Sequence, residues 1–161
     1  EETFSKDLTE REEVERELVR LVDSVAWRLR KSKKKCRTIS LKVRYSDFTT
    51  FSRSHTSSEP TWLSSVLLEE AKGLLDGVDL SPGVRLLGVS VTNLDKNFVE
   101  QLKFSENPHS DRENTEGVVD LIRDRFGTAS IGPASILGSN GMRVKTKGEQ
   151  QWGPDQDSTI E

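Results

Sequence analysis

Residues 39–46 alternate in a way that restricts the fold of this chain more than any other feature of its sequence. Ile39, Leu41, Val43 and Tyr45 are apolar or aromatic, and the residues between them are basic or hydroxylic. Successive side chains of a β-strand point to opposite faces of its sheet. The alternation therefore predicts a strand with one face against a core and the other face in water.

Two segments with helical periodicity lie on either side of this region. The first is expected from residue 10 to about residue 31, with acids near its start and bases near its end, as the helix dipole favours. Thr9 and Glu12 match a capping box at its start. The second helix is expected to have Thr61 as its N-cap and to stop at Gly77.

Three further segments are expected to be strands. Residues 2–5 form a short edge strand, residues 49–56 return from the first strand as a hairpin, and residues 84–92 form the last strand. Phe48 and Phe51 lie on opposite parities, so we expect a β-bulge in the returning strand.

The order of these elements is β-α-β-β-α-β within residues 1–94. It predicts an α+β fold, with a four-stranded, largely antiparallel sheet and two helices on one face. Because each helix has one apolar stripe, the other face of the sheet stays open to water or to a partner. The alternation assigns the following residues to this open face: Ser40, Lys42, Arg44, Ser90 and Thr92. Arg53 is also expected on this face, if the register of the returning strand places its side chain there.

One stretch of the chain carries most of its positive charge. The formal net charge of the whole chain is −3, yet residues 28–53 hold ten basic residues against one acid, Asp47, a net charge of +9. An acidic protein with one positive region has the electrostatic pattern of a polyanion binder. The alternative is an ordinary run of solvated lysines.

Length and composition set limits on function. The 161 residues leave room for one domain and a tail, and only 32% of them are hydrophobic. No apolar run approaches the roughly 20 residues of a membrane-spanning helix, so we expect no membrane partner. Cys36 is the only cysteine and no secretory leader is visible, which predicts a cytoplasmic protein. The chain starts with Glu1 instead of Met, and we interpret it as a piece of a longer protein.

The sequence predicts no catalytic site. Two histidines and one cysteine form no cluster with zinc spacing, and neither the phosphate-loop pattern nor the dinucleotide-binding glycine pattern occurs. Paired carboxylates lie on helix surfaces, where solvated charges are the ordinary explanation. We therefore expect no cofactor and no metal in this chain.

Four segments, in this order and at these separations, resemble the C-terminal part of bacterial Y-family DNA polymerases of the DNA polymerase IV type. They are residues 2–8, 41–50, 83–91 and 122–127. The resemblance covers residues 1–137 and implies that the central piece is a little finger domain, whose open face straddles the DNA backbone. It implies a non-catalytic domain that binds damaged DNA or primer–template in translesion synthesis and DNA repair. The catalytic palm domain of the family, with its magnesium-binding carboxylates, has no counterpart here.

The resemblance also implies which residues contact DNA. They come from three strands and one basic segment: Lys42 and Arg44, then Ser52, Arg53, Ser54 and His55, then Gly88, Ser90 and Thr92, with Lys33, Lys34 and Lys35 as the basic segment. The family commonly has a second base where this chain has His55. These contacts are to the backbone and carry no sequence specificity.

The resemblance implies a further partner, the sliding clamp. The family carries a clamp-binding peptide with the pattern Gln-Leu-x-Leu-Phe, and Gln101, Leu102 and Phe104 match it with one apolar residue missing. The alternative is a linker that happens to contain these residues.

The chain is expected to divide into four parts. A little-finger-like domain over residues 1–94 is followed by a linker over 95–114. A short helix and an apolar element then occupy 115–137, and a disordered tail occupies 138–161.

Two other functions stay open at this point. A sheet of this topology also suits a ferredoxin-like module that binds a protein or a small ligand, with the basic stretch serving solubility. A remnant without activity is a third possibility. The salt dependence of binding separates the first two, because only contacts to several phosphates make affinity fall steeply with salt.

Overall fold

A computed structural model describes residues 1–95, 110–138 and 141–142. Six elements form the central domain in chain order: β1 (Glu2–Leu8), α1 (Arg11–Lys31), β2 (Lys35–Tyr45), β3 (Thr50–Thr61), α2 (Ser64–Asp76) and β4 (Val84–Asp95). After them come α3 (Ser110–Phe126), a 3-10 turn η1 (Ala134–Ile136) and the two short paired strands β5 (Leu137–Gly138) and β6 (Gly141–Met142).

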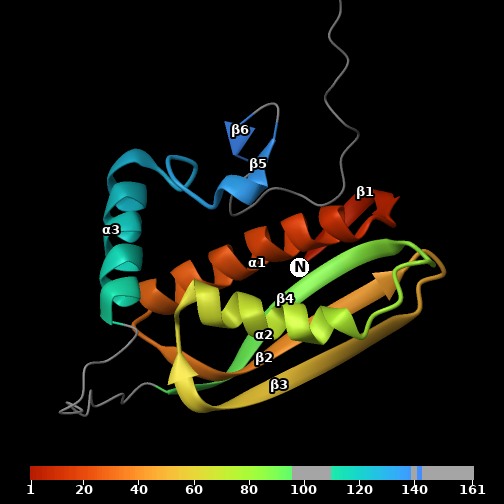
Figure 1. The fold of residues 1–161 in the computed structure, drawn as a ribbon, viewed down its shortest axis with the longest axis horizontal. Helices are drawn as coiled ribbons and strands as arrows, with labels where there is room; N and C mark the ends of the chain where they lie inside the picture. The colour runs from red at the N-terminus through yellow and green to blue at the C-terminus, as the bar shows by residue number, and fades with distance from the viewer. Residues whose placement is uncertain (96–109, 139–140, 143–161) are drawn as a thin grey trace, which may run out of the picture.

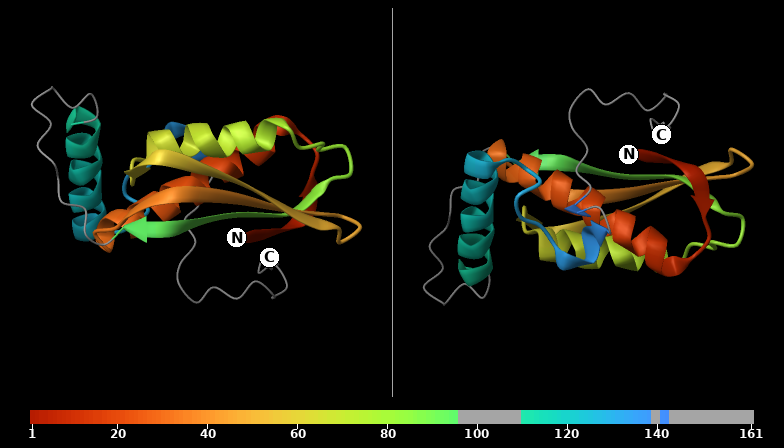
Figure 2. Two further views of the ribbon diagram at one scale, coloured as in Figure 1. Left: turned by 90° about the horizontal axis from the view of Figure 1, so that it is seen from below. Right: turned by 90° about the horizontal axis from the view of Figure 1, so that it is seen from above.

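The main sheet has the strand order β1-β4-β2-β3, and all three neighbouring pairs are antiparallel. α1 and α2 lie side by side on one face of this sheet, and α3 stands across the C-terminal end of α1 (Figures 1 and 2). The predicted α+β class, strand number and one-sided helix layer are therefore confirmed.

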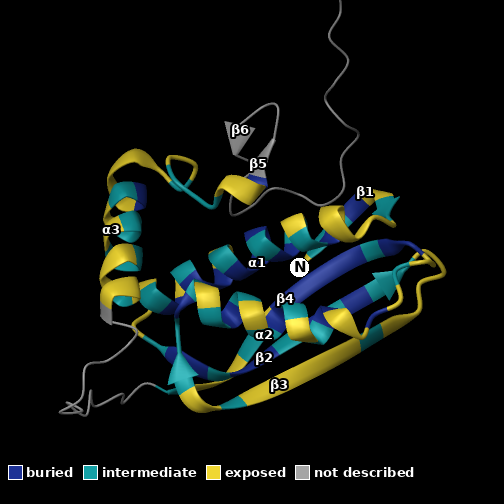
Figure 3. Ribbon diagram, in the orientation of Figure 1, coloured by how far each residue is buried: buried dark blue, intermediate teal, exposed yellow. Residues whose placement is uncertain are grey.

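The core lies between the helix pair and the sheet. Leu18 of α1 and Leu75 of α2 are fully buried, as are Ile39, Leu41 and Val43 of β2. Figure 3 shows this interior face as a buried band, whereas most of β3 at the sheet edge is exposed. The alternation of β2 is thus the pattern of a strand between two neighbours, covered on one face only.

Neither helix begins in the predicted way. The N-cap of α1 is Glu10, and no side chain caps the helix there, so the predicted capping box is wrong. The N-cap of α2 is Leu63, and the Thr61 hydroxyl instead accepts a hydrogen bond of 3.1 Å from the Leu63 amide. The predicted stop at Gly77 is confirmed, since this residue is the C-cap of α2.

The returning strand has an irregularity, but away from Phe48 and Phe51: β3 has extra residues between Thr56 and Thr61, opposite Cys36 and Thr38. Phe48 lies in the turn between β2 and β3 with a left-handed φ of 67°. Because it is outside β3, Phe48 and Phe51 do not have to point to the same face of the sheet. The pairing of residues 50–56 with β2 is regular, and the register shifts only between Cys36 and Thr38.

Candidate nucleic-acid interface

The register of the sheet determines which side chains share the face without helices. Directly opposed residues of antiparallel strands point to the same face. On β2 this face carries Thr38, Ser40, Lys42 and Arg44. Opposite them on β3 are Thr56, Ser54, Ser52 and Thr50, and opposite them on β4 are Thr92, Ser90, Gly88 and Leu86. We call these twelve residues the open face.

Hydroxyl and basic groups dominate the open face, and several of them fix one another. Arg44 Nε donates to Thr50 Oγ1 at 2.8 Å, and the hydroxyls of Thr38 and Thr56 are 2.9 Å apart. Lys42 Nζ donates to Glu1 Oε2 at 2.9 Å, and this hydrogen bond lowers the pKa of the Glu1 carboxyl. Long basic side chains are in this way oriented along a strip of short hydroxyl side chains.

Gly88 is buried in the middle of this face, next to Glu1. A Cβ atom added there would lie 3.1 Å from Glu1 Cβ and 3.4 Å from Lys42 Cβ, closer than ordinary contact. The glycine therefore lets Glu1 and the Lys42 side chain pack closely against the backbone of β4.

The predicted members Ser40, Lys42, Arg44, Ser90 and Thr92 lie on the open face, as do Ser52, Ser54 and Gly88. Arg53 and His55 do not. They oppose Leu41 and Ile39, so they belong to the helix side of the edge strand, and the assignment of Arg53 to the open face is wrong.

Arg53 instead packs at the end of α2. Its guanidinium lies over the Phe51 ring, 5.9 Å from the centroid, and any Cβ at Gly77 would collide with it. A cation at a helix C-terminus interacts favourably with the helix dipole. The position of Arg53 is thus explained by packing against α2.

The three lysines of the predicted basic segment have different surroundings. Lys33 and Lys34 lie in the turn between α1 and β2, and Lys33 is exposed there with a φ of 52°. Lys35 is only 8% exposed. Its Nζ lies 3.0 Å from the Glu113 carboxylate and 4.5 Å from the centroid of the Trp62 ring. Lys35 therefore faces α3 in the folded chain, and its predicted contact with DNA stays a prediction.

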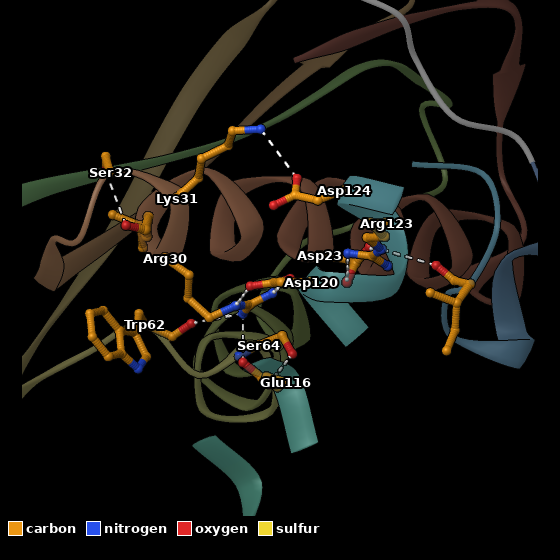
Figure 4. A network of polar contacts seen from close by, with 12 residues as sticks. Asp23, Arg30, Lys31, Ser32, Trp62, Ser64, Glu116, Asp120, Arg123 and Asp124 are labelled. Carbon is orange, nitrogen blue, oxygen red and sulfur yellow. Dashed lines mark hydrogen bonds and ion pairs between the residues drawn. The ribbon is translucent and has the colours of Figure 1, made fainter. Parts of the chain in front are cut away.

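Helix α3 was only partly predicted. It begins at Ser110, five residues before the expected start, so the last part of the predicted linker is helical. Figure 4 shows how it meets α1 and the start of α2. Arg30 Nε and Nη2 contact both oxygens of Asp120 at 2.6 and 2.9 Å, and Arg30 Nη1 contacts Glu116 at 2.5 Å.

α3 also provides a hydrogen-bond acceptor for the N-terminus of α2. Burial opposes the charge of Arg30, but the hydrogen bond to Asp120 and the charge of Glu116 outweigh it and raise the Arg30 pKa. Glu116 Oε1 accepts a hydrogen bond of 2.9 Å from the Ser64 amide, and it also accepts from the Ser64 hydroxyl. Glu116 thus satisfies an amide at the first turn of α2, where Leu63 has no side chain that can do so. The carboxylates of α3 recur at helical spacing in the sequence. This spacing is the one sequence signal that indicates a charged helix face able to contact α1 and α2.

Some predictions fall on residues that the structure does not describe. These are the clamp-binding residues Gln101, Leu102 and Phe104, most of the linker, and all of the predicted tail except Gly138, Gly141 and Met142. Within the described ranges, no three metal-ligating side chains gather into a candidate metal site. No helix in the described part of the chain is long and apolar enough to cross a membrane.

Three comparisons match this chain to known proteins. The family model described as the impB/mucB/samB family C-terminal domain matches residues 1–104. DNA polymerase IV of Streptomyces coelicolor is 48% identical over 94 residues, which are 58% of this chain and 20% of that protein. DNA polymerase IV of Desulfatibacillum aliphaticivorans is 33% identical over 139 residues, which are 84% of this chain and 35% of that protein.

A solved structure is also similar. It is described as a complex of the beta-clamp processivity factor and the little finger domain of PolIV, with a TM-score of 0.49 and 27% identity, covering 64% of this chain and 93% of that one. The chain spans between a fifth and about a third of the length of the two polymerases named above.

Proposed function

Because the chain belongs to the impB/mucB/samB family C-terminal domain, the C-terminal region of Y-family DNA polymerases of the DNA polymerase IV type, we propose that its open face binds the backbone of primer–template DNA. The observation that carries the proposal is the register of the sheet. It gathers Lys42, Arg44 and a strip of serine and threonine hydroxyls on the one face that neither α1 nor α2 covers.

The chemistry of this face suits phosphate groups better than bases. Lysine, arginine, serine and threonine side chains and backbone amides are the usual donors to phosphate oxygens, and such contacts position a protein on DNA without reading its sequence. Most open-face side chains are too short to enter a groove and read base edges. We therefore propose a contact that depends on the backbone and accepts any sequence, as a polymerase that moves along its template requires.

Within a full polymerase, this domain would hold primer–template while an upstream palm domain performs nucleotide transfer with magnesium. Damage bypass and DNA repair would be activities of that whole protein. This chain alone is proposed to be non-catalytic. In a primer-extension assay with nucleotides and magnesium it should add no nucleotide, and template-directed incorporation by the purified chain would overturn this assignment.

The test of DNA binding is the double variant Lys42→Ala/Arg44→Ala, compared with Arg16→Ala/Lys72→Ala. The control pair removes the same charge from α1 and α2, on the helix side. Duplex binding by fluorescence anisotropy should be roughly micromolar for the wild-type chain. The open-face variant should lose about tenfold in affinity, and its log–log salt slope should fall by about 2, since each lost phosphate contact contributes roughly 0.9. The control should change little.

Equal binding by the open-face variant and the wild-type chain would show that DNA does not lie on this face. Binding of a small molecule or protein with almost no salt dependence would instead favour the ligand-binding alternative.

We also propose that Gln101, Leu102 and Phe104 bind the sliding clamp. The support is the sequence pattern of an amide and two apolar anchors, which suits an extended peptide that inserts side chains into preformed pockets. A peptide of residues 95–110 should bind the clamp weakly, and Phe104→Ala should weaken it roughly tenfold, because burying one phenylalanine contributes about 1.5–3 kcal/mol. If the two peptides bind alike, the segment is a linker.

A further inference from the structure

Helix α3 contacts the rest of the molecule through its carboxylates. Those carboxylates pair with bases at the C-terminal end of α1 and the start of β2. The ion pairs are Glu113–Lys35 at 3.0 Å, Glu116–Arg30 at 2.5 Å, Asp120–Arg30 at 2.6 Å and Asp124–Lys31 at 3.4 Å. With steps of three or four residues, the four acids form one stripe along the helix. We call this stripe the acidic stripe.

Three apolar side chains of α3 are exposed, whereas Val119 and Ile122 are half-buried. Val118, Leu121 and Phe126 are 56%, 70% and 68% exposed. An amphipathic helix on a globular domain normally buries its apolar face and exposes its charges. α3 instead leaves three apolar side chains exposed, so ion pairs and hydrogen bonds supply much of its attachment, and these weaken in competition with salt or other anions.

One end of the segment has a different attachment. Arg123 pairs with Asp23 of α1 at 2.8 Å and donates to the Ile131 carbonyl, and Ile136 of η1 is buried. These contacts at the C-terminal end of α3 do not involve the acidic stripe.

The bases under the acidic stripe have the composition of a polyanion site. Arg30 and Lys31 end α1, and Lys35 begins β2. Lys31 Nζ is 4.8 Å from the centroid of the Trp27 ring, and Lys35 Nζ is 4.5 Å from that of Trp62. Cations interleaved with tryptophan rings are typical of sites for nucleic-acid strands. In the folded chain these bases pair with the carboxylates of α3.

Strand β2 connects this cluster to the open face. β2 begins at Lys35, beside the end of α1, and runs on to Lys42 and Arg44. The turn with the exposed Lys33 joins the two regions. In Figure 2, α3 stands at this end of the sheet, alongside the helix layer.

We propose that Arg30, Lys31 and Lys35 form a second binding site for nucleic-acid phosphates, which the acidic stripe of α3 occupies and which DNA takes over by displacing that stripe. The proposal rests on the proposed function, since it requires a chain that binds DNA. It assigns α3 the part of an internal competitor that sets the affinity and salt dependence of the whole chain.

The experiment compares duplex affinity of the full chain and of Glu113→Gln/Asp124→Asn over a range of salt concentrations. These two substitutions weaken the stripe but leave the Arg30 network and the Ser64 contact intact. The variant should bind DNA roughly three- to tenfold more tightly, with a salt slope steeper by about 1–2, because Lys31 and Lys35 become available to phosphates. The matched control is Glu69→Gln/Asp111→Asn, which removes the same charge from two exposed carboxylates and should bind within about twofold of the wild-type chain.

Adding Lys31→Gln to the first variant should remove part of the gain. If the variant and its control bind equally, or if the gain survives Lys31→Gln unchanged, the second site does not exist. If the wild-type chain itself binds no DNA, the proposed function has failed first, so the two failures are distinguishable.

Discussion

The two halves of the basic stretch over residues 28–53 have opposite surroundings in the folded chain. In the first half, Arg30, Lys31 and Lys35 are paired with carboxylates of α3. In the second half, Lys42 and Arg44 lie on the open face among hydroxyl groups, and the carboxylate beside Lys42 belongs to residue 1. A net charge counted along the sequence therefore does not describe a surface, because acids far along the chain can neutralise one half of a basic run and leave the other.

The largest difference between the halves is expected in stability. Arg30→Ala leaves Asp120 and Glu116, both largely buried, without their partner, and removing one member of such a network costs about 3 kcal/mol. Lys42→Ala breaks a half-exposed pair, which is worth less than about 1 kcal/mol. Urea unfolding of both variants measures the contrast. Equal urea midpoints for the two variants would mean that the first half of the basic stretch contributes no more to stability than the second half.

The second prediction addresses DNA binding by the open face. Ser40 and Ser90 oppose each other at its centre, so Ser40→Glu/Ser90→Glu places two negative charges where phosphates are proposed to lie. DNA affinity should fall by tenfold or more, because the new carboxylates repel the phosphates and no favourable contact offsets the cost of removing both from water. The control is Ser24→Glu/Thr115→Glu, at exposed sites on α1 and α3, and it should lose much less. Comparable losses in the two double variants would show that only net charge matters.

These comparisons also show what the sequence can and cannot predict. The alternation of β2 predicts the positions of Ser40, Lys42 and Arg44 correctly, because side chains of a strand that is buried on one face alternate with a period of two. Arg53 was misplaced because the register of a hairpin depends on its turn, and the left-handed Phe48 takes that residue out of the strand.

The docking of α3 needed the structure for another reason. Asp120 lies 90 residues from Arg30 in sequence, and no local pattern specifies which bases a stripe of acids will meet. The start of α2 is a similar case. The sequence suggests Thr61, three residues before the first residue of α2, as the cap, whereas Glu116 of α3 provides the acceptor for the Ser64 amide.

The third prediction concerns that acceptor. Glu116→Ala leaves the Ser64 amide without its partner and removes one contact of Arg30, so unfolding free energy should fall by about 1–2 kcal/mol, as for the loss of an N-cap. Glu116→Gln keeps an oxygen that can accept from Ser64 and should lose less. The comparison of the two by thermal or urea unfolding separates the cap from the charge. A larger loss in Glu116→Gln than in Glu116→Ala would contradict the capping role.

The smallest expected effect is at Cys36, which lies in β2 between the two halves. Burial raises the pKa of its thiol from 9.0 to about 11, and the charge of Glu70 adds to the shift. Because the folded state holds the proton more tightly, this contribution to stability is complete below pH 9 and is lost as the pH rises through about 11. At about pH 8 the native thiol should therefore react with iodoacetamide far more slowly than in urea, since only the thiolate reacts. Arg30→Ala should speed this reaction by making opening of the domain easier, whereas Lys42→Ala should leave it unchanged. If the reaction rate rises equally in both variants, both halves of the basic stretch stabilise β2 against the same opening. The two halves would then differ in their charge pairing but not in their contribution to stability.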